Sequence, residues 1–158
     1  MPMKSLVNGR QSGFSMIEVL VTLVILAVGL LGLAGLQSVG LKNSHSSLGR
    51  STATMLAYNI IDRMRSNCQS ALDGDYDIAI GTAAPSSPSN QVQRDQKQWK
   101  DALSASLVAG DGSISVNASN FLATVNIRWN DSRSTGGSST YTVSVEGVLP
   151  ALATCQGI

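Results

Sequence analysis

Residues 13–36 read GFSMIEVLVTLVILAVGLLGLAGL, and this stretch decides the fold. Within residues 19–36 the one polar side chain is Thr22. Residues 14–17 lengthen the apolar run to the roughly 20 residues that a helix needs to cross about 30 Å of hydrocarbon. We therefore expect this segment to be a helix in a lipid bilayer.

A single carboxylate, Glu18, lies at the start of the apolar run. A charge in a bilayer costs on the order of 2 to 4 kcal/mol on the mildest scales and usually marks a partner or a function. We expect its partner to be a cation within the membrane. An ordinary signal peptide has a shorter apolar stretch, but an uncleaved signal anchor with Lys4 and Arg10 on the cytoplasmic side remains open.

The composition limits what the rest of the chain can be. Of 158 residues, those outside the apolar run suffice for one modest domain. Removing residues 1–13 would take away two bases, Lys4 and Arg10, and no acid, which leaves nine bases against ten acids. Nucleic-acid binders normally carry a clustered basic face, so this balance argues against nucleic acid as a partner.

The N-terminal pattern resembles that of the type IV pilins and pseudopilins. In that family the leader ends in glycine, phenylalanine follows, and a glutamate stands four residues further on, as do Gly13, Phe14 and Glu18 here. The resemblance implies that prepilin peptidase cuts between Gly13 and Phe14 and methylates the new amino group of Phe14. That amine could then neutralise Glu18 of a neighbouring subunit in the low-dielectric core of a filament, which makes Glu18 an assembly contact.

The resemblance also implies an α+β fold of the type IV pilin kind, with a long N-terminal helix packed on a small antiparallel sheet. We assign residues 1–13 to the leader peptide, 14–36 to the transmembrane and assembly helix, 37–72 to the amphipathic half of the same helix, and 73–158 to a globular head. A continuous helix from about residue 14 to 68 is expected. Its second half repeats apolar residues that we place on one face: Leu41, Leu48, Met55, Leu56, Ile60 and Met64.

The head should contain one short helix and three strands. Residues 81–92 are rich in Pro, Ser and Ala and predict an exposed connection. Residues 94–108 predict a helix whose Trp99 belongs to the core, together with Leu103 and Leu107. Period-2 alternation predicts antiparallel strands at 113–117, 123–129 and 141–145 with an extension to Val148, and a flexible hairpin connection at 130–139.

One face of this sheet should cover the long helix, since its apolar side chains alternate with polar ones. The residues expected on that face are Val125, Ile127, Trp129, Tyr141, Val143 and Val145.

A narrower resemblance points to the PilV branch of minor pilins. Residues 56–67, LAYNIIDRMRSN, are similar to that branch, as are residues 29–37, residues 74–76 and Trp99 with Leu103. In the string 56–67, Asp62 could pair with Arg63 or Arg65 locally or contact another subunit. A solvated helix face is the simpler interpretation.

Two cysteines, Cys68 and Cys155, fall in the part that this topology places outside the cytoplasm. Oxidising conditions there favour a disulfide, which would pin the C-terminal tail to the helix, although free or intermolecular thiols stay open. His45, the only histidine, reads as a solvated or capping residue. Asp73, Asp75 and Asp77 alternate as calcium ligands sometimes do but lack the twelve-residue calcium loop.

We therefore expect that the protein is not an enzyme and that it has no cofactor or metal site. The resemblance implies a minor pilin that helps to initiate or enter a type IV pilus and so supports adhesion and twitching motility. The expected partners are prepilin peptidase, other minor and major pilins, inner-membrane pilus assembly proteins and the lipid bilayer.

The protein would begin as a single-pass inner-membrane protein with a periplasmic head. Two alternatives stay open at this point. One is a minor pseudopilin of a type II secretion system, and the other is a signal-anchored binding module without catalytic activity.

Overall fold

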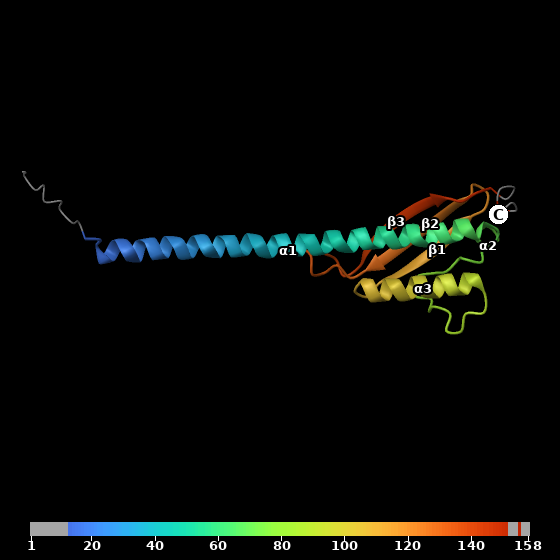
Figure 1. Ribbon diagram of the computed structural model, residues 1–158, viewed down its shortest axis with the longest axis horizontal. Coiled ribbons are helices and arrows are strands. Elements are labelled where there is room, and N and C mark those ends of the chain that lie inside the picture. The colour runs from blue at the N-terminus through green and yellow to red at the C-terminus, as the bar shows by residue number, and fades with distance from the viewer. Residues whose placement is uncertain (1–12, 152–154, 156–158) are drawn as a thin grey trace, which may run out of the picture. The chain divides into compact units, whose positions relative to one another are not determined.

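The computed structural model of the protein describes residues 13–151 and Cys155 (Figure 1). The chain divides into two compact units, Met1–Gly40 and Leu41–Ile158. The elements follow in the order α1 (Met16–Ser66), α2 (Cys68–Leu72), α3 (Gln91–Ser106), β1 (Asp111–Asn117), β2 (Leu122–Trp129) and β3 (Tyr141–Val148). This is the α+β, type IV pilin-like fold that the sequence predicts.

The sheet has three antiparallel strands in the order β1-β2-β3. Its register places Ile114 of β1 opposite Val125 of β2, and Val125 opposite Val145 of β3. The three predicted strands are confirmed to within two residues, because period-2 alternation is a strong signal where one sheet face is buried. On the other face Thr142, Ser144 and Glu146 of β3 are exposed.

One face of the sheet is covered by two helices. The part of α1 from Leu41 onward reaches β3, where Ile61 lies so close to Gly147 that a Cβ there would be 2.7 Å from Ile61 Cγ2. Helix α3 reaches β1 on the same face, where Trp99 lies against Gly112. Figure 1 shows both helices beside the sheet. The core of the head therefore lies between the sheet and these two helices.

The face of α1 that enters this core differs from the expected one. Ile60 and Met64 are buried as predicted, but Leu41, Leu48 and Met55 are exposed. At 100° per residue these three lie almost opposite the buried side of the helix. The buried residues of α1 are Ser46, Ala53, Ala57, Ile60, Ile61 and Met64. Alanine carries little hydrophobic signal, so the sequence pattern favoured the larger leucines.

The helix boundaries also need two corrections. Helix α1 ends at Ser66 rather than near residue 68, because Asn67 leaves the helical conformation with φ −128° and ψ 51°. A separate short helix, α2, follows it. Helix α3 begins at Gln91, three residues earlier than predicted. The side chain of Asn90 accepts a hydrogen bond from the Gln93 N–H at 2.9 Å and thereby caps this helix.

Replacement of Gly112 by alanine tests the contact between α3 and the sheet. The added Cβ would lie 2.7 Å from Trp99 Cη2 and 2.8 Å from Asn126 O, so an aromatic ring or a strand must move. We expect Gly112→Ala to lower the free energy of unfolding by about 1–3 kcal/mol. Chemical denaturation of the full chain in lipid nanodiscs, followed by near-UV circular dichroism, measures this. Ser115→Ala, on the exposed face of β1, should change it little, and equal stability of the two variants would contradict the packing described.

Candidate processing and assembly site

The start of α1 presents the residues of the N-terminal motif on an open stretch of chain. Gly13 and Phe14 precede the helix and are exposed, Phe14 to 82%. The carbonyl oxygen of Ser15 accepts hydrogen bonds from the N–H groups of Glu18 (3.0 Å) and Val19 (3.3 Å), which starts the helix. The bond between Gly13 and Phe14 therefore lies outside regular structure, where a peptidase can reach it.

Glu18 lies in the first turn of α1. A carboxylate there is favoured by the positive end of the helix dipole. Within residues 13–151 and 155 no cation pairs with it. In hydrocarbon such a carboxylate needs an opposite charge.

The residues after Glu18 form an apolar surface suited to lipid. Large side chains from Val19 to Leu36 are about half exposed or more, and none of the most apolar 18-residue window is buried. The hydroxyl of Thr22 donates within the helix, to the carbonyl oxygens of Glu18 (3.0 Å) and Val19 (2.8 Å). Among the described residues α1 alone is long and apolar enough to cross a membrane, judged by length and composition.

In the head, a buried charge cluster attaches α1 to α3. The Asp95 carboxylate is buried, and its Oδ1 accepts from Arg63 Nη1 at 3.1 Å. Its Oδ2 accepts from the Tyr76 hydroxyl at 2.7 Å. Burial, together with the hydrogen bond to Asp95, raises the pKa of Tyr76 to about 12. No local sequence pattern indicates this cluster, since its three members come from distant segments.

Of the two arginines that the sequence offers as partners of Asp62, Arg65 makes the contact. Its Nη1 lies 2.8 Å from Asp62 Oδ1 on the exposed side of α1, and its Nε donates to the carbonyl oxygen of Val148. Arg63 turns instead to α3 and Asp95. The two arginines of residues 56–67 therefore both serve the head's own structure.

A second buried ion pair holds α3 against β1. Lys100 Nζ lies 2.5 Å from Asp111 Oδ1, and Asp111 also accepts from the N–H groups of Gly81 and Gly112. Burial by itself would raise the pKa of Asp111, but these three hydrogen bonds outweigh burial and hold that pKa below its usual value. This pair also fastens the connection after Ile78 to the edge of β1.

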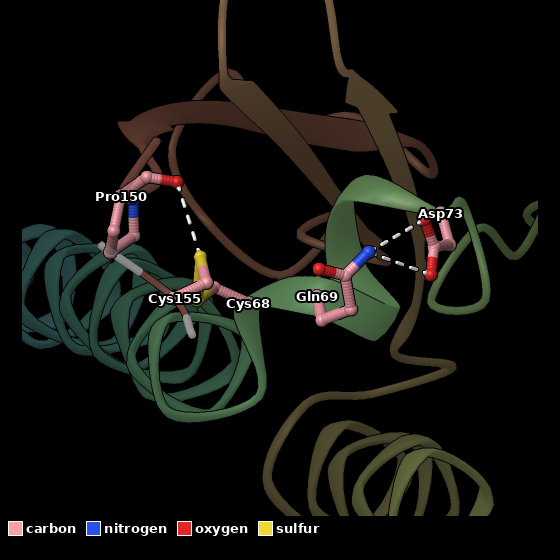
Figure 2. Close-up of a disulfide and its surroundings, with 5 residues drawn as sticks. All are labelled: Cys68, Gln69, Asp73, Pro150 and Cys155. Carbon is pink, nitrogen blue, oxygen red and sulfur yellow. Dashed lines mark hydrogen bonds between the residues drawn. A yellow bond between two sulfur atoms is a disulfide. The ribbon is translucent and has the colours of Figure 1, made fainter. Parts of the chain in front are cut away.

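Cys68 and Cys155 are joined in the structure, with Cα atoms 5.8 Å apart and a separation of 87 positions in sequence (Figure 2). The bond ties the chain beyond β3 to the start of α2. Cys155 Sγ lies 3.5 Å from Pro150 O. Because the bonded sulfur carries no proton, this is a packing contact.

Of the three aspartates that resemble calcium ligands, Asp73 and Asp77 make separate contacts. Asp73 accepts two hydrogen bonds from Gln69 Nε2, at 3.0 and 3.1 Å (Figure 2). Asp77 Oδ1 accepts from the N–H of Val116. Across the described residues no group of three or more metal-binding side chains occurs. His45 is exposed, as expected for a solvated residue.

Comparison with known proteins gives one match. Residues 8–34 match the prokaryotic N-terminal methylation motif, a range that includes Gly13, Phe14 and Glu18. No curated protein and no solved structure matches the chain. The motif supports a type IV pilin-like or prepilin protein and suggests a structural rather than a catalytic role. With the apolar helix it also suggests anchoring in the inner membrane.

The buried hydroxyl of Tyr76 predicts a loss of stability at high pH. Its pKa is about 12 in the folded head, against about 10 in an unfolded chain. The stabilisation is complete below pH 10 and is lost as the pH rises through 12, since unfolding then releases a proton. We expect Tyr76→Phe to lower the free energy of unfolding by about 1–3 kcal/mol at pH 7.

Thermal unfolding from pH 8 to 12 measures the effect. The melting temperature of the wild type should fall more steeply above pH 10 than that of Tyr76→Phe, so the two curves converge. Tyr58→Phe, at a half-exposed position of α1, is the matched control. Parallel curves for wild type and Tyr76→Phe would show that the hydroxyl does not keep its proton in the way described.

Proposed function

We propose that the protein is a minor pilin of the PilV branch, made as an inner-membrane prepilin and processed between Gly13 and Phe14. Prepilin peptidase methylates the new amino group of Phe14, and the long helix then leaves the bilayer for a growing type IV pilus or its priming complex. The observation that carries the proposal is the set of Gly13, Phe14 and Glu18 at the head of an exposed apolar helix, within the matched methylation motif.

Glu18 sets the register between subunits in this proposal. In the membrane its carboxylate has no partner among the described residues, and this is costly. In a filament the amino group of Phe14 on an adjacent subunit pairs with it. A low dielectric strengthens this attraction, and the same low dielectric penalises any register that leaves the two charges apart.

The head supplies a second contact with other pilins. Leu41, Leu48 and Met55 are spaced seven apart and are 72%, 65% and 63% exposed. Apolar side chains left open along one helix line typically mark a protein–protein contact. Neighbouring minor and major pilins would cover this line in the assembled structure. Support for adhesion and twitching motility would follow from the pilus and not from chemistry in the head.

Substitution of Glu18 tests the proposal in the native cell. We expect Glu18→Gln to be processed and membrane-inserted normally but to fall at least tenfold in sheared surface filaments, since loss of one partner of a buried pair costs about 3–5 kcal/mol. Thr22→Val is the matched control, because the Thr22 hydroxyl bonds only within its own helix. Filament levels of Glu18→Gln equal to those of Thr22→Val would contradict the assembly role.

Deletion of the gene separates the pilus from a secretion system. We expect surface piliation and twitching to decrease while secretion of exoproteins is retained. The opposite result would assign the chain to the pseudopilins of a type II secretion system. A protein that stays in the membrane, with both activities intact, would be an anchored binding module.

A further inference from the structure

The head contains a cavity of about 290 Å³ that shares only Leu48 with the proposed line of contact to other pilins. It lies between α1, the end of α3 and the beginning of the connection from β2 to β3. Its walls include Leu48, Gly49, Val108, Trp129, Asp131 and Arg133. This volume is at the lower end of the range of about 300–1,000 Å³ found for ligand sites, so it suits a small molecule or a single blocked amino acid.

An indole N–H group without an acceptor opens into this cavity. Trp129 is 3% exposed, yet its Nε1 donates to no acceptor in the part of the chain that the structure describes. Trp99, the other tryptophan, donates to Leu56 O at 3.1 Å. No fully buried side-chain nitrogen of the described residues lacks a partner, so the small exposed part of Trp129 includes Nε1. The ring is buried while its N–H group faces the cavity and is open to water, so a ligand that brings an acceptor can replace that water.

Gly49 is the reason that the donor stays open. A Cβ at Gly49 would lie 3.4 Å from Trp129 Nε1 and 3.8 Å from Cε2. Any other residue would place its side chain over the N–H edge of the indole. Glycine within a helix is less stable than alanine, and here it leaves the indole N–H uncovered.

The shape of the site limits the ligand to one that meets the edge of the ring. The ring of Trp129 packs on Tyr141, with centroids 4.9 Å apart, and the ring is almost fully buried. Stacking of a sugar or a base on its face is therefore excluded. Leu48 and Val108 are 65% and 48% exposed and offer apolar surface at the rim. The site thus combines one donor with an apolar wall.

The charges at the cavity favour an uncharged acceptor. Asp131 is buried, and its Oδ2 accepts hydrogen bonds from Ser46 Oγ at 2.7 Å and Ser134 Oγ at 3.0 Å. Arg133 is exposed and forms no ion pair with another described residue. Since Asp131 offsets Arg133, a carboxylate ligand gains little, and a carbonyl oxygen avoids repulsion from Asp131.

We propose that this cavity binds a small uncharged ligand that carries a carbonyl oxygen beside a branched apolar group. The carbonyl accepts the hydrogen bond from Trp129 Nε1, and the apolar group lies against Leu48 and Val108. N-acetyl-L-leucinamide has this chemistry and an appropriate size. The site shares no residue with the N-terminal motif, so a failure of this proposal can be told apart from a failure of the prepilin proposal.

Tryptophan NMR tests the proposal directly on the full chain, ¹⁵N-labelled at the indole nitrogens and held in lipid nanodiscs. The spectrum should show two indole signals. On titration with N-acetyl-L-leucinamide we expect the Trp129 proton signal to move downfield and to saturate at a roughly millimolar concentration, as suits a ligand of this size. The Trp99 signal, whose N–H already has an acceptor, should not move. Absence of a saturable Trp129 shift, or an equal shift of both signals, would overturn the proposal.

Two variants locate the site. Gly49→Ala covers the N–H with a methyl group and should weaken binding at least fivefold, whereas Gly40→Ala, on the same helix with no atom within 4 Å of the added Cβ, should not. Val108→Ser changes only a half-exposed wall residue and should weaken binding about threefold without endangering the fold. Unchanged affinity in both Gly49→Ala and Val108→Ser, or tighter binding of N-acetyl-L-leucine than of its amide, would contradict this assignment.

Discussion

The packing of small residues of α1 against one sheet face is the constraint on which the head depends. Ala53 and Ala57 are fully buried and have no side chain beyond Cβ, so they take up little space in the core. Ile60, Ile61 and Met64 then fill the space further along. Because this face is buried, the larger leucines on the opposite side of α1 stay outside. The same packing leaves Leu41, Leu48 and Met55 exposed, as the proposed contact with other pilins requires.

Polar clusters at the edges of this core fix the second helix in place. Asp95 of α3 accepts hydrogen bonds from Arg63 of α1 and from Tyr76 in the segment before α3. Lys100 of α3 pairs with Asp111 of β1. Asp95 and Lys100 are buried, and each lies beside an opposite charge, which is the condition under which such charges are tolerated. Glu18 differs from them, since no described residue pairs with it. A carboxylate without a partner among the described residues is what the proposed contact between subunits requires.

Much of the fold could be predicted from the sequence, for physical reasons that are local. The apolar run after Glu18 and the period-2 alternation in β2 and β3 each depend on neighbouring residues alone. The end of α1 at Asn67 and the early start of α3 were missed because a single Asn changes a helix boundary without altering the hydrophobic pattern. The burial of Ala53 was missed because alanine is common on either face of a helix.

The candidate functional residues also differ in how far the sequence alone predicts them. Gly13, Phe14 and Glu18 belong to one short motif of the chain, so the sequence alone could single them out. The N–H of Trp129, opened by Gly49, depends on two residues 80 positions apart, and no pattern in the chain brings them together. Asp131 likewise stands in a segment that reads as a flexible connection, yet Ser46 holds it in a buried position.

The central claim is that this chain is a prepilin, and the mass of its N-terminus in the native cell tests that claim most directly. Intact-mass and N-terminal peptide analysis should find a chain that begins with N-methylated Phe14 in the wild type. In Gly13→Ala this species should be absent and the leader retained. An uncut wild-type N-terminus, or a cut after the apolar run, would contradict the account and leave Glu18 without its assembly role.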